Sequence, residues 1–348
     1  MTSYPLFARL ILTLVIGAGG SFLAYSFNLP AAMLAGALGS VAIASIAGAP
    51  VVVNNRLRQI ALVAVGALVG SSVSPHTLDT ILIWPLSAAL MLISVIVMLT
   101  TIPAYLIAYH GLDKLTARLA TVPGALSYVM AIAEESNADT KRVAVLQTMR
   151  LASLMILFPI VVKLTLEPAT GLRSTGTELS AIDFFILFGS CSVAAILVSR
   201  LNVLAASFFC SMIASSLLYG SGIVSGSVPN YIVWPALIVT GSAIGARFAG
   251  TDRRYLVQCA RMGFFTLSLA LIISLLFALP VAYYFELPVV QVWLAYAPGG
   301  IDTMTVLAFA LGVEPAFVAG HQLIRLLCLS LAVPFLFRKD SPRKIQQG

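Results

Sequence analysis

The feature that most constrains this chain is a series of apolar runs of about 20 residues, with few polar residues between them. An α-helix of about 20 residues spans the roughly 30 Å hydrocarbon core of a bilayer. Hydrophobic residues make up 60% of the 348 residues and charged residues 9%, against about 25% charged residues in a soluble domain. A water-soluble fold cannot bury so much apolar surface, and we therefore predict an all-α polytopic membrane protein. A cytosolic enzyme, a nucleic-acid-binding module and a disordered regulator are excluded as the main body of the chain.

Proline, glycine and charged residues divide the apolar sequence into predicted helices. Ten of these are predicted to span the bilayer: residues 6–28, 31–48, 57–73, 79–109, 141–166, 181–200, 203–220, 229–248, 256–285 and 315–337. Two further apolar stretches, 113–134 and 288–312, each contain a Pro-Gly pair near the centre. The first run is too long for a signal peptide, whose apolar region has about 7–15 residues, and we interpret it as an uncleaved spanning helix.

The two halves of the chain repeat each other at an almost constant shift of 175 residues. The motif Leu119-Ala120-x-x-Pro123-Gly124 recurs as Leu294-Ala295-x-x-Pro298-Gly299, and Gln147-x-x-Arg150 recurs as Gln322-x-x-Arg325. The pair Gly66-x-x-x-Gly70 likewise recurs as Gly241-x-x-x-Gly245. Several motifs in one register indicate a duplication. We predict a first membrane repeat at 1–166, a linker at 167–180, a second membrane repeat at 181–337 and a tail at 338–348.

The distribution of lysine and arginine predicts how the repeats are oriented, because cytoplasmic loops carry an excess of both. If both Pro-Gly stretches enter the membrane and return, each repeat has five spans and the second repeat is inverted. The cytoplasmic side then holds 16 Lys and Arg residues and the outside holds two. If both stretches span fully, the repeats are parallel and the ratio falls to 11 to 7. We therefore predict inverted repeats, with both termini cytoplasmic and the linker on the opposite side of the membrane.

Each Pro-Gly stretch has about ten residues on either side of the break, enough for a half-helix of roughly 15 Å. Proline disfavours a helical residue before it, and glycine permits a sharp change of direction. We predict one re-entrant hairpin per repeat, with a kinked spanning helix as the alternative. Broken helices that face each other near the midplane are typical of transporter binding sites.

Arg150 and Arg325 are predicted to lie near the bilayer centre, where an arginine costs about 3 kcal/mol or more. Gln147 and Gln322 each precede one of these arginines by one helical turn and lie on the same face. Two interpretations remain open. The arginines either pair with structural acids, namely Glu134, Glu135 or Asp302, or bind a small anion. The anion site would comprise Arg150, Arg325, Gln147, Gln322, Pro123, Gly124, Pro298, Gly299, Gly300, Ser127 and Asp302.

Proton or ion coupling has four candidate residues, Asp302, Glu134, Glu135 and His321. Asp302 is the only acid in the second Pro-Gly segment, and its counterpart in the first repeat is Ser127. It could bind a cation, relay a proton or pair with one of the arginines. A histidine such as His321 can titrate near neutral pH, but it can also serve only in packing. The three histidines and four cysteines are widely separated, so we expect no metal site and no cofactor.

The segments VPGALSYVMAIAEESNADTKRVAVLQTMRL and APGGIDTMTVLAFALGVEPAFVAGHQLIRLL resemble the duplicated unit of the AbrB-type integral membrane proteins of Gram-negative bacteria. The resemblance covers nearly the whole chain and implies an inner-membrane protein. That family bears two labels, regulator of gene expression and ammonia monooxygenase. It is distinct from the small soluble DNA-binding regulator of the same name. Neither label is supported by the residues. An oxygenase would need clustered metal ligands or an organic cofactor, and the three isolated histidines do not provide such a cluster. Direct DNA binding is not expected, because no extramembrane segment is long enough for a helix-turn-helix domain.

The sequence thus predicts a secondary-transporter-like protein, and not an enzyme, that binds a small anionic solute at the midplane between the repeats. No GxxxxGK[ST] motif occurs, so a gradient would supply the energy. The alternative is a membrane-embedded protein that affects gene expression indirectly and transports nothing. The expected partners are the lipid bilayer and a small anionic solute, without direct contact to nucleic acid. The sequence leaves open whether the chain forms a homo-oligomer.

Overall fold

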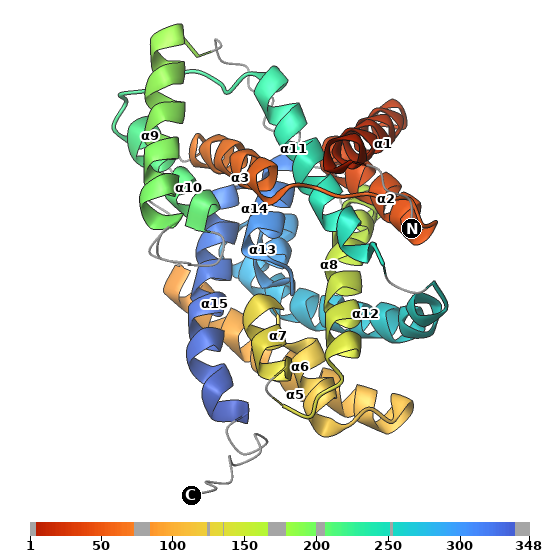
Figure 1. Cartoon of the computed structure of the whole chain (residues 1–348). Helices are drawn as coiled ribbons and strands as arrows, with labels where there is room; N and C mark the ends of the chain where they lie inside the picture. Colours follow the sequence, from red (N-terminus) through yellow and green to blue (C-terminus); the bar gives the residue numbers. More distant parts are fainter. Residues whose placement is uncertain are drawn as a thin grey trace, which may run out of the picture. The chain divides into compact units, whose positions relative to one another are not determined.

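The computed structural model describes residues 5–72, 84–123, 126–134, 136–165, 179–199, 206–250 and 253–337. These residues are mostly helical (Figure 1). The first half contains α1 (Leu6–Ser26), α2 (Ala32–Ile46), α3 (Asn55–Gly70), α5 (Trp84–His110), α6 (Lys114–Thr121), α7 (Leu126–Glu134) and α8 (Thr140–Thr165). The second half contains α9 (Ala181–Ser199), α10 (Ala206–Gly220), α11 (Asn230–Gly245), the 3-10 turn η2 (Ala246–Phe248), α12 (Arg253–Tyr284), α13 (Val289–Tyr296), α14 (Ile301–Ala310) and α15 (Pro315–Phe337).

Seven helices in the described part of the chain are long and apolar enough to cross a membrane. This confirms the prediction of an all-helical, multi-pass membrane protein. A helix overlaps most of each of the ten ranges predicted to span, although α3, α5, α8 and α12 extend beyond the predicted bounds by one to three residues. Helices α2, α3 and α10 have 15 or 16 residues, which corresponds to about 23 Å of length. They are therefore shorter than a straight span of roughly 30 Å.

The helix is interrupted at both Pro-Gly segments. Helix α6 ends at Thr121 and α7 begins at Leu126, while α13 ends at Tyr296 and α14 begins at Ile301. Proline has no backbone N–H and disfavours helical geometry at the residue before it. Val122 and Ala297, which precede the two prolines, accordingly have ψ angles of 121° and 142°. Each stretch is thus a pair of short helices, with residues 122–123 and 297–300 non-helical between them.

The chain forms two compact units, and each unit contains helices from both sequence repeats. Unit 1 consists of residues 1–82, 155–253 and 302–317. Unit 2 consists of residues 83–154, 254–301 and 318–348. Unit 1 therefore holds α1 to α3 and α9 to α11, and unit 2 holds α5 to α7, most of α12, and α13.

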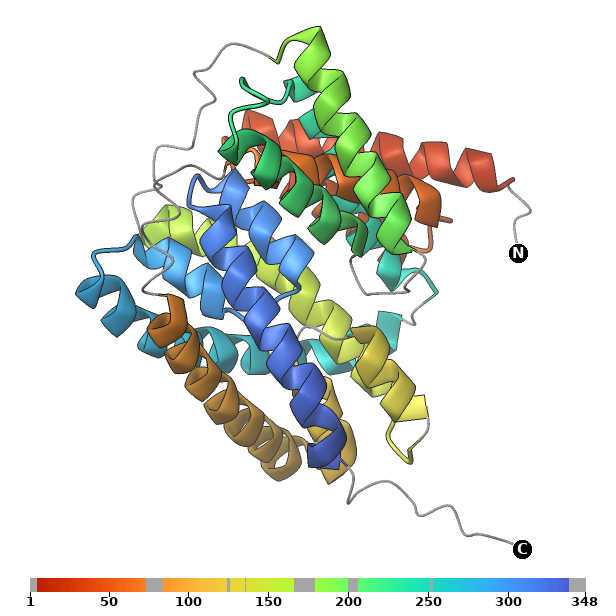
Figure 2. The same ribbon diagram turned by 90° about the vertical axis from the view of Figure 1, so that its left-hand side faces the viewer.

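Within unit 1, equivalent glycines of the two repeats make equivalent helix contacts. A Cβ added to Gly66 of α3 would lie 2.5 Å from the carbonyl oxygen of Phe208 in α10. A Cβ added to Gly241 of α11 would lie 2.4 Å from the carbonyl oxygen of Leu34 in α2. Small residues let membrane helices approach this closely. Helices α9 and α10 also lie side by side, as do α1 and α2 (Figures 1 and 2).

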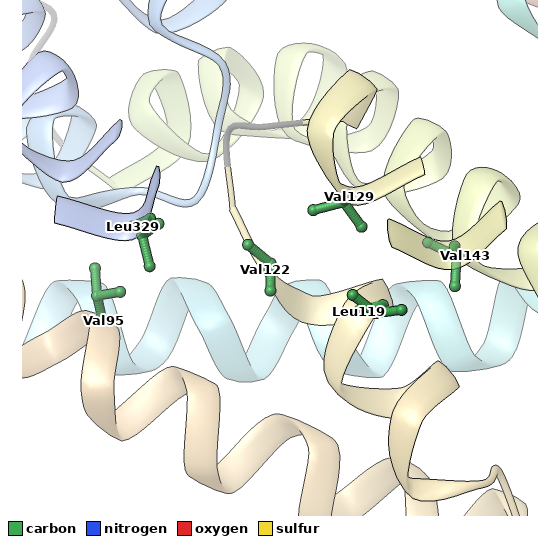
Figure 3. Close-up of a cluster of buried hydrophobic side chains, with 7 residues drawn as sticks. Val95, Leu119, Val122, Val129, Val143 and Leu329 are labelled. Atoms are coloured by element: carbon green, nitrogen blue, oxygen red, sulfur yellow. The ribbon is translucent and has the colours of Figure 1, made fainter. Parts of the chain in front are cut away.

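Within unit 2, buried apolar side chains surround the first Pro-Gly link (Figure 3). Val122 of the link packs with Leu119 of α6 and Val129 of α7, together with side chains from α5, α8 and α15. A second cluster joins α5 to α12 through Met98, Ile102, Ala270 and Ile273. In a membrane such side chains hold helices together by van der Waals packing, because lipid tails are as apolar as the side chains themselves. The first cluster anchors Val122, at the start of the link, inside unit 2.

Candidate functional site

The carbonyl groups at the C-terminal end of α6 are bound by two side chains of α8. Gln147 donates from Nε2 to the carbonyl oxygen of Leu119 at 2.9 Å. Arg150 donates from Nη1 to Thr121 at 3.2 Å and from Nη2 to Val122 at 3.3 Å. The last four carbonyls of a helix have no partner inside the helix. Gln147 and Arg150 supply that partner where the Pro-Gly link prevents the helix from continuing.

The second repeat has the same arrangement at the end of α13. Gln322 donates from Nε2 to Leu294 at 2.9 Å, Ala295 at 3.1 Å and Ala297 at 3.2 Å. Arg325 donates from Nη1 to Ala297 at 2.7 Å. Its Nη2 donates to the carbonyl of Gly299 and to Oε1 of Gln322. Gln322 therefore binds the carbonyls and also orients the guanidinium.

Two contacts of the breaks correspond along the repeat. Leu119 accepts from Gln147 as Leu294 accepts from Gln322. Val122 accepts from Arg150 as Ala297 accepts from Arg325. The predicted Q-x-x-R motif thus has a structural function in both halves: it binds the C-terminal carbonyls of a broken helix.

These contacts bear on whether structural acids neutralise the arginines. Within the described residues of unit 2, neither guanidinium forms an ion pair, and each directs its Nη atoms at carbonyl oxygens. Glu134 is exposed at the end of α7, and Glu135 lies outside the described residues. Asp302, the second residue of α14, belongs to unit 1, and its Oδ1 accepts from the backbone N–H of Thr303 at 3.0 Å. The described partners of the two guanidiniums are therefore helix carbonyls and Gln322, and pairing with Glu135 or Asp302 stays a prediction.

A small cavity lies beside Arg150, where the two Pro-Gly links come together. It has a volume of about 20 Å³, and Thr121, Pro123, Arg150, Thr266 and Pro298 are among its lining residues. A polar cavity of at least about 10–15 Å³ can hold one water molecule. Arg150 is 7% exposed, and its Nε has no hydrogen-bond partner among the described residues. Pro123 and Pro298 thus line the same cavity as the buried Arg150, whose Nε–H makes no hydrogen bond within the described residues.

His321 belongs to a separate buried network in unit 2. Its Nε2 lies 2.9 Å from Oγ of Ser87 in α5. Tyr296, the last residue of α13, donates from its hydroxyl to the carbonyl oxygen of Ser87 at 2.6 Å. The same hydroxyl lies 3.2 Å from the Ser87 hydroxyl. All three residues have an exposed fraction of 0%, and His321 directly precedes Gln322 in α15.

The comparison with protein families decides what kind of chain this is. The model of the family described as "Transition state regulatory protein AbrB" matches residues 33–339. The chain belongs to the AbrB family. The "Putative regulator AbrB" of Escherichia coli (strain K12) is 24% identical over 351 residues and covers 94% of each chain. The "Uncharacterized protein YhjN" of Bacillus subtilis (strain 168) is 25% identical over 317 residues, with 82% of this chain and 79% of that protein covered.

Some predicted site residues of this AbrB-family chain lie outside the description. Gly124 is outside the described residues, and the side chain of Ser127 in α7 is not described. Gly299 and Gly300 form the non-helical link before α14.

Sequence reasoning did not select Ser87 or Tyr296. Both lie within apolar runs, where no polar pattern marks them. The sequence signal that could have pointed to Tyr296 is its position directly before the Ala-Pro-Gly-Gly link.

Proposed function

We propose that this AbrB-family protein is a secondary-transporter-like membrane protein that binds a small anionic solute at its two broken helices. The observation that carries the proposal is the pair of buried arginines, Arg150 and Arg325, which bind the helix-end carbonyls and have no carboxylate partner in the described part of unit 2. Transport, not catalysis, is the activity that this arrangement supports.

Charge arithmetic favours an anion over a neutral solute. Each guanidinium carries one positive charge, and the C-terminal end of a helix carries an effective charge of about −0.5. The two arginines and the two half-helix ends, α6 and α13, therefore leave a net charge of roughly +1. An isolated charge is costly in hydrocarbon, and a bound monovalent anion would neutralise it. The free Nε of Arg150 beside the small cavity is the donor that such an anion would approach.

The proposed site lies near the midplane between two inverted five-helix repeats, each with a re-entrant hairpin. The 16-to-2 distribution of lysine and arginine supports this topology, and the matched contacts of Gly66 with Phe208 and Gly241 with Leu34 support the duplication. It places both termini on the cytoplasmic side of a bacterial inner membrane. The 167–180 linker is periplasmic in this arrangement.

A proton or ion gradient would drive the transport, with Asp302, Glu134, Glu135 and His321 as candidate coupling residues. His321 is the candidate that lies closest in sequence to the arginine motif, four residues before Arg325 in α15. Residues i and i+4 of a helix are neighbours. A proton on His321 would therefore add positive charge beside the anion site and favour uptake of the proton together with the anion.

Flux measurements in sealed vesicles test this proposal. We expect uptake or efflux of small organic acids that responds to a proton gradient. Arg150→Lys keeps the charge and loses the planar donor fork, so it should retain weak binding, whereas Arg150→Gln should lose it. Arg142→Gln removes a partly exposed charge from the same helix and should transport normally. Folded Arg150→Gln and Arg325→Gln proteins with unchanged flux would contradict the proposal.

The second candidate function is an indirect role in gene regulation without transport. The family description and the printed name of the Escherichia coli relative favour it. A chain that senses an anion at the same site would regulate through a partner protein. Vesicles that bind the anion but show no flux across the membrane would favour this alternative.

A further inference from the structure

A groove of about 520 Å³ opens in unit 1, far larger than the cavity beside Arg150. One face of α3 lines it with Arg56, Gln59, Ile60, Val63 and Ala64. These positions follow the i, i+3, i+4, i+7 pattern, which places them on one side of the helix. One face of α9 lines the opposite side, including Phe184 and Phe188 one turn apart. The groove therefore runs along the faces of these two helices, and its largely apolar lining also includes Ser207 of α10 and Ile232 of α11.

The groove has the length and volume of one lipid chain. Its lining residues on α9 run from Phe184 to Ile196, about 18 Å along the helix. One leaflet of the hydrocarbon core is roughly 15 Å deep. Pockets that enclose a small ligand measure about 300–1,000 Å³. The groove is thus long enough for an acyl chain that spans one leaflet, and its volume lies in the range of ligand-binding pockets.

Charge gathers at one end of this groove. Arg56 and Gln59 are exposed and lie in the first turns of α3. The first turn of α3 contains no acidic residue, although the N-terminus of a helix favours negative charge. Arg56, which lines the groove, instead adds positive charge to that end. An anionic group bound there would satisfy both the arginine and the helix dipole.

We infer that this groove binds an anionic phospholipid, with the phosphate at Arg56 and one acyl chain along Ile60, Val63 and the α9 aromatics. Basic pockets between membrane helices on the cytoplasmic side are suited to anionic lipid headgroups. The start of α3 is on that side in the topology that the charge distribution predicts. The inference concerns unit 1 alone and does not depend on the solute site of unit 2.

Thermal unfolding of the full chain in neutral detergent tests the inference, with phosphatidylglycerol and phosphatidylcholine of identical acyl chains as probes. Phosphatidylglycerol should raise the unfolding temperature more than phosphatidylcholine. Arg56→Gln should weaken the phosphatidylglycerol affinity about fivefold, as expected for one basic residue at a membrane surface. Ala64→Phe fills the groove and should reduce the effect of both lipids.

Arg58→Gln is the matched control, because it removes the same charge two residues along α3 and Arg58 is not among the groove-lining residues. It should retain the response of the unchanged protein. If the Arg56 and Arg58 variants lost phosphatidylglycerol affinity equally, the effect would be a general electrostatic one, and this would overturn the inference. Equal responses to the two lipids would overturn it too, as would native mass spectra showing that a second copy of the chain excludes lipid from the groove.

Discussion

Arg325 donates through Nη1 to the carbonyl oxygen of Ala297 at 2.7 Å, and Ala297 is the first residue beyond α13. The side chain of one helix thus closes the end of another that is 28 residues away in sequence. Arg150 has the same relationship to Val122. A buried cation is stable in this position because it faces the negative end of a helix dipole. The same contacts fix the two guanidiniums where an anion could approach both broken helices.

Arg325→Gln should destabilise the protein more than Arg150→Gln. Arg325 donates to three acceptors and is 1% exposed, whereas Arg150 donates to two acceptors and is 7% exposed. Each buried carbonyl left without a donor costs about 1–3 kcal/mol. Thermal unfolding in detergent should therefore rank the variants, with Arg325→Gln least stable.

Arg142→Gln provides the control for that ranking. Arg142 lies on the same helix as Arg150 but pairs with Asp139 at the surface, at 3.2 Å. An exposed ion pair contributes about 0–1 kcal/mol, so its loss should hardly shift the unfolding temperature. Equal shifts for all three variants would show that loss of charge, and not loss of the carbonyl contacts, determines stability.

Gly66→Ala and Gly241→Ala should both destabilise unit 1, and by similar amounts. Each added Cβ would meet a backbone carbonyl oxygen at 2.4–2.5 Å, which forces the two helices apart. Gly189→Ala is the matched control because a Cβ there meets nothing within 4 Å. Alanine is the better helix former by roughly 1 kcal/mol, so this variant should be neutral or slightly more stable. Thermal unfolding that ranks Gly189→Ala below the other two would contradict the packing argument.

The elements that sequence reasoning predicted are those whose signal is local. Apolar runs predicted the helices, and Pro123 and Pro298 predicted the two breaks, because proline changes the backbone wherever it occurs. The register of 175 residues predicted that Gln147 and Gln322 would correspond, and the structure gives them corresponding carbonyl acceptors.

The partners of the arginines could not be predicted in the same way. A backbone carbonyl has no signature in the sequence, so only acids such as Glu134 and Asp302 could be named as candidates. The buried contact of Tyr296 with Ser87 spans 209 residues, and nothing local marks either residue. The division of the helices into two units was likewise not predicted, because each unit combines helices from both repeats.

Reporter fusions at Gly222 and Gly171 should both give a periplasmic signal. Gly222 follows α10, with a φ of 73°, and Gly171 lies in the predicted linker. In the inverted topology both positions face outward, since the loops around them carry few lysines or arginines. Fusions at the C-terminus should read as cytoplasmic in the same strain. A cytoplasmic signal at Gly222 or Gly171 would exclude the inverted arrangement.

Ser87→Ala and Tyr296→Phe should be strongly non-additive. Ser87 Oγ lies within hydrogen-bond distance of both His321 Nε2 and the Tyr296 hydroxyl, and all of these groups are fully buried. Residues that share one buried network couple by about 0.5–3 kcal/mol in a double-mutant cycle. The free energies of unfolding of the two single variants and the double variant measure this coupling.

Ser94→Ala is the control, because the buried Ser94 hydroxyl donates to the carbonyl of Met91 within the same helix. Its effect should add to that of Tyr296→Phe. A cycle with Ser87 that is as additive as the one with Ser94 would show that the three side chains are neighbours without forming a network.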